Sequence, residues 1–161
     1  MTVAQALTAL AVRFLAIDVA GQSDPLRAVT TLRDAVNVSD FPLVVLRKAT
    51  GATVHTLGQE TLGLPGLGLD RYQVEWHILI APASVPTEEA DELLQPWGRA
   101  LLVALLADLS LGGAVHSIGE IDSTGRLCDY QQGLVTWIDS NRYWGLRGLL
   151  QIQELVSAPV G

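Results

Sequence analysis

The clearest pattern in the chain is an alternation of apolar and polar positions over residues 71–80. The apolar positions recur at every second residue: Tyr72, Val74, Trp76, Ile78 and Ile80. Successive side chains of a β-strand point to opposite faces of the sheet. The spacing therefore predicts a strand that buries one face and exposes polar side chains on the other. Pro82 is expected to end this strand.

Two segments near the N-terminus repeat at helical spacing instead. Thr2 is a suitable N-cap, and a single apolar stripe follows it at intervals of three and four residues: Val3, Leu7, Leu10, Phe14 and Ile17. Gly21 is expected to stop this helix. Asp24 and Pro25 predict the start of a second, short helix, because Asp caps helices and Pro suits their first position. Its apolar positions are Leu26, Val29, Leu32 and Val36.

A long helix is predicted to begin at Thr87, with Glu88 and Glu89 in its first turn, where the helix dipole favours acids. Pro96 either kinks this helix or starts a new one. Beyond it, one face carries Trp97, Leu101, Leu105 and Leu109, and Leu102, Val103 and Leu106 widen that face. A helix that is apolar nearly all round is expected to be buried on two sides.

The remaining apolar runs predict further strands. These cover residues 43–46, 52–58 and 114–121, and a hairpin of residues 134–138 with residues 143–155, in which Trp137 is expected to lie opposite Trp144. We predict an α+β fold, loosely α/β mixed, with a mainly antiparallel sheet covered by an N-terminal helix and a long helix. The chain is expected to be one domain of residues 1–161, with a helical part at 1–40, the sheet and long helix at 41–155, and a loose tail at 156–161.

The composition is unusually apolar for a chain of 161 residues. Hydrophobic residues make up 49% and charged residues 17%, the mean hydropathy is +0.33, and the formal charge is −7. The acidic balance argues against a strongly basic nucleic-acid binder, and the hydrophobicity argues against disorder. The longest strictly apolar run, residues 100–107, is too short to span a bilayer, and no signal peptide is expected. Self-association is the simplest use of the apolar excess.

The histidines offer one candidate metal site. If residues 52–58 pair with residues 71–80, His55 falls close to His77, and Glu75 would complete a weak site. The alternative is that both imidazoles lie on the exposed face of the sheet, and a register slip of one residue would separate them. We favour that alternative and expect no bound metal or cofactor.

Nucleophilic catalysis has little support in the sequence. No Gly-x-Ser-x-Gly elbow is present, and Cys128 precedes Asp129, whose charge should raise the pKa of the thiol. The glycine-rich segment of residues 63–69 has the wrong order for a dinucleotide fingerprint. It suits contact with another chain. We therefore name as interface candidates the apolar residues of this segment, the acids of the long helix and one aromatic residue: Leu64, Leu67, Leu69, Glu88, Glu89 and Tyr143. For the aromatic residue, the expectation is that only one of Tyr143 and Trp144 is buried.

The order of these elements resembles the tail terminator, or tail completion, proteins of long-tailed bacteriophages. The resemblance includes the apolar N-terminal helix, the strand FPLVVL at 41–46, the flexible hairpin and the alternating strand at 72–80. It continues through a long helix that ends in LSLGG at 109–113 and a terminal strand YWGLRGLLQIQE at 143–154. It covers most of the chain through patterns and short phrases, without an invariant site.

The resemblance implies a structural virion protein without catalytic residues. Members of that family form a ring, commonly of six subunits, that stops tail-tube polymerisation and docks the head connector or stopper protein. DNA passes through the lumen without sequence-specific binding, no membrane is involved, and assembly takes place in the host cytoplasm. The resemblance does not assign contact residues; our own candidates for exposed contact regions are the segments at 63–70 and 88–92. The alternatives are another head–tail joining or tail-tube protein, or a small metal-binding or enzymatic domain that uses His55 and His77.

Overall fold

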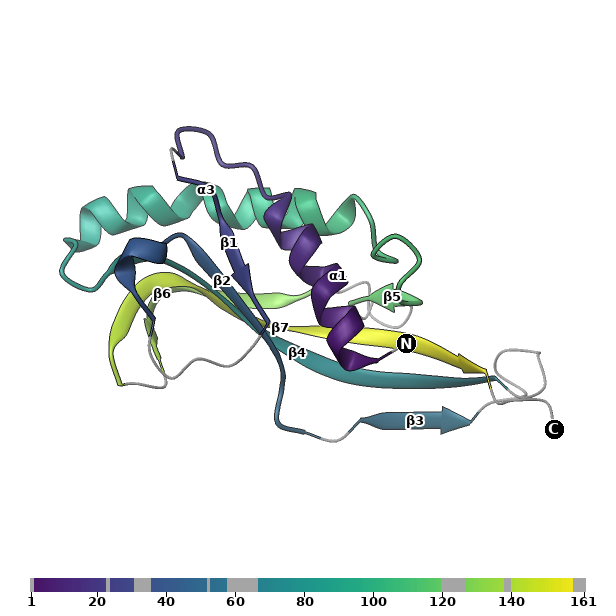
Figure 1. The fold of residues 1–161 in the computed structure, drawn as a ribbon. Coiled ribbons are helices and arrows are strands. Elements are labelled where there is room, and N and C mark those ends of the chain that lie inside the picture. The colour runs from purple at the N-terminus through teal and green to yellow at the C-terminus, as the bar shows by residue number, and fades with distance from the viewer. Residues whose placement is uncertain are drawn as a thin grey trace.

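The fold is built on two long antiparallel strands that are distant in sequence. The computed structural model describes residues 2–22, 24–30, 36–51, 53–57, 67–119, 127–137 and 140–157. Strands β4 (Leu67–Pro82) and β7 (Arg142–Ser157) have 16 residues each and pair along almost their whole length, with an irregularity between Leu79 and Ala81. Together they form the spine of one mixed sheet (Figure 1).

Shorter strands extend the sheet from each side of this spine. Near one end, β2 (Leu43–Lys48) pairs with β4, β1 (Arg27–Val29) adds to β2 in parallel, and β6 (Asp129–Thr136) pairs with β7. Near the other end, β3 (Val54–Leu57) pairs with β4, and β5 (Ser117–Ile118) pairs with β7. All pairs except β1–β2 are antiparallel, so the chain has the α+β fold that the sequence predicts.

Two helices lie on the same side of the sheet (Figure 1). Helix α1 (Val3–Leu15) starts with a complete capping box, in which Thr2 and Gln5 satisfy each other's backbone N–H groups. Helix α3 (Thr87–Leu106) runs without interruption through Pro96, and a short 3₁₀ turn, η1 (Val38–Asp40), precedes β2. Within the described ranges, neither α-helix combines the length and the apolarity that crossing a bilayer requires.

The main core lies between the helices and the sheet. Strand β4 contributes the alternating residues that the sequence predicts, with Tyr72, Val74, Trp76 and Ile78 buried, and β7 contributes Trp144, Leu146, Leu150 and Ile152. The helices add two apolar stripes: Leu7, Leu10 and Phe14 from α1, and Leu94, Trp97, Leu101 and Leu105 from α3. The buried faces predicted for β4 and β7 and the buried stripes of both helices are confirmed, except that Ile80 is only partly buried beyond the irregularity at Leu79. The expectation that α3 is buried on two sides was wrong for the single chain, because Leu102, Val103 and Leu106 are exposed.

A second, smaller core lies on the opposite face of the sheet. It consists of Phe41, Leu43, Val45, Leu79, Trp137 and Tyr143. The rings of Phe41 and Tyr143 meet edge to face, with their centroids 5.3 Å apart. The expectation that only one of Tyr143 and Trp144 is buried was wrong, because each of the two faces has a core of its own.

Local signals misled the sequence interpretation at several elements. Residues 27–29 form β1 and not a helix, because pairing with β2 satisfies their backbone groups. Trp144 lies opposite Leu134 and not opposite Trp137, which lies beyond the last residue of β6. Strand β7 continues to Ser157, so the expected loose tail was wrong for residues 156–157. The predicted strand at 114–121 is limited to the two residues of β5 within the described segment.

Candidate functional site

The helical side of the molecule carries an exposed apolar surface. Helices α1 and α3 are joined by a hydrogen bond in which Arg13 Nε donates to the Ala104 carbonyl, at 2.8 Å. Exposed apolar residues lie within two positions of Arg13 or Ala104 in the sequence, and we call them the helical apolar patch: Val12 and Leu15 of α1, and Leu102, Val103 and Leu106 of α3. Val12 is 63% exposed and Val103 is 64% exposed, so the face of α3 turned away from the core is uncovered in the single chain.

The first turn of α3 carries two of the predicted interface residues. Glu88 and Glu89 are both exposed there, as the sequence suggests, and no side chain caps this end of the helix. Acids near a helix N-terminus complement the helix dipole. This explains the presence of Glu88 and Glu89 without any partner, so their position alone does not identify an interface.

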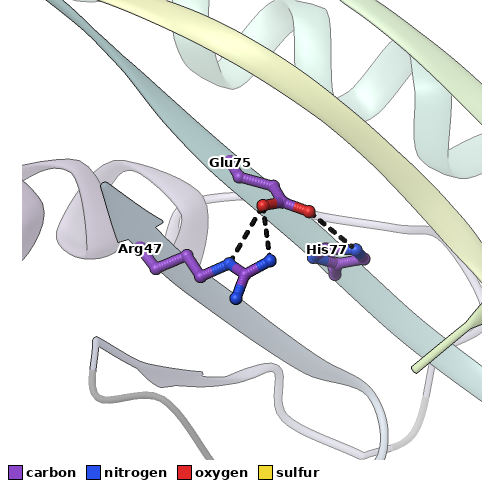
Figure 2. Close-up of polar contacts among 3 residues, drawn as sticks. All are labelled: Arg47, Glu75 and His77. Atoms are coloured by element: carbon purple, nitrogen blue, oxygen red, sulfur yellow. Dashed lines mark hydrogen bonds and ion pairs between the residues drawn. The ribbon is translucent and has the colours of Figure 1, made fainter. Parts of the chain in front are cut away.

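The face of the sheet opposite the helices carries a polar cluster that spans two strands. Glu75 of β4 lies opposite Arg47 of β2, and one carboxylate oxygen accepts hydrogen bonds from Arg47 Nε at 2.9 Å and Nη2 at 2.6 Å. The other carboxylate oxygen lies 3.6 Å from His77 Nε2, which is too long for a hydrogen bond. Figure 2 shows the Glu75 carboxylate between the guanidinium and the imidazole.

His77 is part of the smaller core and not an exposed imidazole. Its side chain is 5% exposed, and its ring meets Trp137 edge to face, with the centroids 5.0 Å apart. Burial lowers the pKa of His77 to about 4, opposed by Glu75 and assisted by the charges of Arg147 and Arg47. The imidazole is therefore neutral at neutral pH, and the expectation that it faces solvent was wrong.

The proposed pairing of His55 with His77 was also wrong. Strands β3 and β4 do pair, but the register places His55 opposite Asp70, seven residues before His77 on β4. At roughly 3.3 Å per residue, seven residues separate the two register positions by about 23 Å. In the described part of the chain, no group of three or more His, Cys, Asp and Glu residues is arranged to hold a metal ion. A metal centre that uses both histidines is therefore excluded.

A hollow of about 520 Å³ opens on the polar face beside this cluster. Its lining includes Glu75, Arg147 and Cys128, together with three glutamines, Gln73, Gln131 and Gln151. Burial, and secondarily the charge of Asp129, raise the pKa of Cys128 to about 11. The thiol is therefore protonated at neutral pH, and the prediction that its pKa is raised is confirmed.

The remaining interface candidates have mixed outcomes. Leu64 lies outside the described residues, while Leu67 and Leu69 belong to the first part of β4 and not to a loop. Leu69 is half-buried between its cross-strand neighbours on β3 and β7. Tyr143 is buried against Phe41, so it is not available as an exposed anchor in the single chain, and this candidate was wrong.

Sequence reasoning missed a second hollow, of about 470 Å³, that lies along β6. Residues 131–136 and Arg147 line it. The sequence interpretation started this strand only at Leu134, because the preceding Tyr-Gln-Gln-Gly segment has no apolar alternation. No pattern of residues 131–136 indicates that they lie at a sheet edge.

Comparison with known proteins adds no family to this description. No protein-family model matches the chain, and no curated protein matches it significantly. The functional argument therefore depends on the chain's own residues and surfaces.

Proposed function

We propose that this protein is a structural, non-enzymatic virion protein that forms a ring at the end of a bacteriophage tail tube. The ring stops tube polymerisation and joins the tail to the head connector, as in the tail terminators that the sequence resembles. The observation that carries this proposal is the helical apolar patch. It is a part of the apolar excess that the single chain leaves exposed, and it lies on two helices that contact each other.

The patch has the features of a subunit interface. Its five side chains are valines and leucines on two helices that the Arg13–Ala104 hydrogen bond holds together. Fully burying one such side chain contributes roughly 1.5–3 kcal/mol, so several together supply a substantial driving force for association. When such a patch contacts a different surface on the next copy, and the rotation between copies closes, the product is a ring. We propose six subunits, the number common among tail terminators.

The proposed partners are a tail-tube protein on one face of the ring and a head connector or stopper protein on the other. Glu88 and Glu89, which are exposed at the start of α3, are proposed contacts at one of these joints. With a formal charge of −7, the chain repels DNA on average. This favours passage of DNA through the lumen without sequence-specific binding. The protein would act in the virion, at the head–tail junction, after assembly in the host cytoplasm.

Native mass spectrometry of the whole chain tests the self-association step. We expect a closed oligomer, and we expect Val103→Asp to shift it toward monomers, because a carboxylate would be buried in an apolar contact. Val38→Asp is the matched control, since Val38 is also exposed but lies in η1, outside the patch. A strictly monomeric wild-type chain at high concentration would contradict the proposal.

Negative-stain microscopy distinguishes a terminator from related tail proteins. A terminator is expected to form rings alone and to limit tube length when mixed with tail-tube protein. Spontaneous long tubes would identify a tube protein instead. Binding to the connector without any effect on tube length would indicate a head-completion protein.

A further inference from the structure

Strand β6 forms an open edge of the sheet. In the described part of the chain, β6 pairs only with β7, so the backbone N–H and C=O groups on its other side have no strand partner. Natural proteins commonly protect such edges with Lys, Pro or an inward-pointing charge. Between Asp129 and Thr136 the strand has no Lys, Arg or Pro, and its only charge is at its first residue. An unprotected edge of eight residues is a template for an added strand.

The second hollow lies along this same edge. Six consecutive residues, 131–136, line its 470 Å³, although successive side chains of a strand point to opposite faces. A hollow that contacts residues of both faces therefore runs along the strand's backbone edge. Its length matches that of an extended segment of about six residues, which is the size of a typical strand.

Arg147 supplies a positive charge in this hollow. Arg147 belongs to the neighbouring strand β7, where it lies opposite Gln131 of β6, and its side chain is exposed. Within the described residues no hydrogen bond or ion pair engages its guanidinium, whereas Arg47 on the same face is held by Glu75. Arg147 also lines the first hollow, so its side chain lies where the two hollows meet. An exposed guanidinium in a groove is suited to bind a carboxylate.

From these three features we infer that the β6 edge binds an extended, carboxylate-bearing segment of another polypeptide as an additional strand. The backbone of the segment would pair with residues 131–136, and its carboxylate would meet Arg147. The residues of this surface belong to β6 and β7 and none of them belongs to the helical apolar patch, so the inference does not depend on the proposed ring.

A synthetic probe tests the inference on the whole chain. The probe is a fluorescein-labelled peptide of eight residues, alternating threonine and valine, with one central glutamate. One matched peptide carries glutamine in place of glutamate, and another carries N-methyl groups along one edge. We expect the glutamate peptide to bind about tenfold more tightly than the glutamine peptide, because a charge-assisted hydrogen bond to Arg147 is about twice as strong as a neutral one. The methylated peptide should bind weakly, because it lacks the backbone donors.

Two variants locate the effect. Arg147→Gln should abolish the preference for glutamate. Arg99→Gln, which removes the same charge from the exposed side of α3, should leave it unchanged. Circular dichroism confirms that both variants are folded. Hydrogen exchange should show slower exchange of amides within residues 131–136 when the glutamate peptide is bound.

Each of the other outcomes overturns the inference. These outcomes are equal affinity for the glutamate and glutamine peptides, unchanged binding of the methylated peptide, an equal loss of preference in Arg99→Gln, and no binding at millimolar peptide. Sedimentation of the wild-type chain and of Arg147→Gln without peptide tests whether a second copy of this protein occupies the edge. If Arg147→Gln alone disperses an oligomer of the wild-type chain, the edge is occupied by a second copy of this protein and not by a different polypeptide.

Discussion

Gly148 of β7 lies directly opposite Trp76 of β4, and a Cβ at Gly148 would lie 2.6 Å from the indole ring. The same Cβ would lie 2.6 Å from the backbone carbonyl of Asp129 on β6. The fully buried Trp76 ring therefore occupies the space that a side chain at position 148 would need. Absence of a side chain on one strand makes room for the largest side chain on the next.

We predict that Gly148→Ala destabilises the protein by about 1–3 kcal/mol, the usual cost of overpacking a core. The tryptophan could shift only by disturbing its own packing, and the Asp129 carbonyl belongs to the sheet. Urea unfolding, followed by tryptophan fluorescence, measures the change. Gly51→Ala is the control, because nothing lies within 4 Å of its added Cβ, and its effect should be within about 0.5 kcal/mol.

His77 should make stability depend on pH in a defined window. The pKa of His77 is lowered from 6.5 to about 4 in the folded chain. As the pH falls from 6.5 to 4, the unfolded chain binds a proton that the folded chain does not bind, so stability decreases over this interval. The loss reaches roughly 3 kcal/mol below pH 4, at about 1.4 kcal/mol per pKa unit.

The comparison of His77→Gln with wild type isolates this contribution from the titration of carboxylates. The free energy of unfolding, measured by urea at pH 7.5 and pH 4.5, should fall less in His77→Gln than in wild type. His116→Gln should behave like wild type, because His116 is exposed. An identical decrease in wild type and His77→Gln would show that the imidazole is not buried in neutral form.

Tyr72 and Glu154 form a buried polar pair across β4 and β7. Tyr72 Oη donates a hydrogen bond of 2.9 Å to Glu154 Oε1, and both side chains are buried. Burial, followed by the interaction with Glu154, raises the pKa of Tyr72, so the hydroxyl remains a donor. Tyr72→Phe should cost about 1–3 kcal/mol, because it leaves a buried carboxylate without this donor.

A double variant tests whether the cost comes from the pair. In Tyr72→Phe/Glu154→Leu both polar partners are removed, so the loss measured by thermal or urea unfolding should be smaller than the sum of the two single losses. Simple additivity would mean that Tyr72 contributes by packing alone.

Long periodic segments made much of the fold predictable. The alternation at 72–78 gives the buried face of β4, and the stripe from Leu7 to Phe14 gives the buried face of α1. In both cases the periodic apolar positions all pack into the same main core, so the local pattern is enough to predict the buried face. Where a segment can instead pair with a strand that is distant in sequence, the local pattern was not enough to predict its structure. Asp24 and Pro25 are a strong helix start, yet residues 27–29 form a strand, because β2 offers parallel pairing that no local signal encodes.

The candidate surfaces were less predictable than the fold, for a related reason. Alternation places His77 on the polar face, but Trp137, 60 residues later, covers it there. The edge position of β6 depends on which strands pair, which a single sequence does not show. The apolar breadth of α3 misled in the opposite direction. It predicted burial on two sides, but Leu102, Val103 and Leu106 form an uncovered face within the described part of the chain.

Arg13 should be needed to hold this uncovered face together. Its guanidinium reaches the Ala104 carbonyl in the last turn of α3, where carbonyls lack helical N–H partners and the last turn has no basic residue of its own. Arg13→Met keeps most of the aliphatic length but removes the donor, so we expect a loss of about 1–3 kcal/mol. Hydrogen exchange should become faster in the last turn of α1 and the last turn of α3. Arg99→Met, on the exposed side of α3, is the control for loss of a charge and should change neither measurement. Unchanged exchange in Arg13→Met would mean that apolar packing alone holds the two helices together.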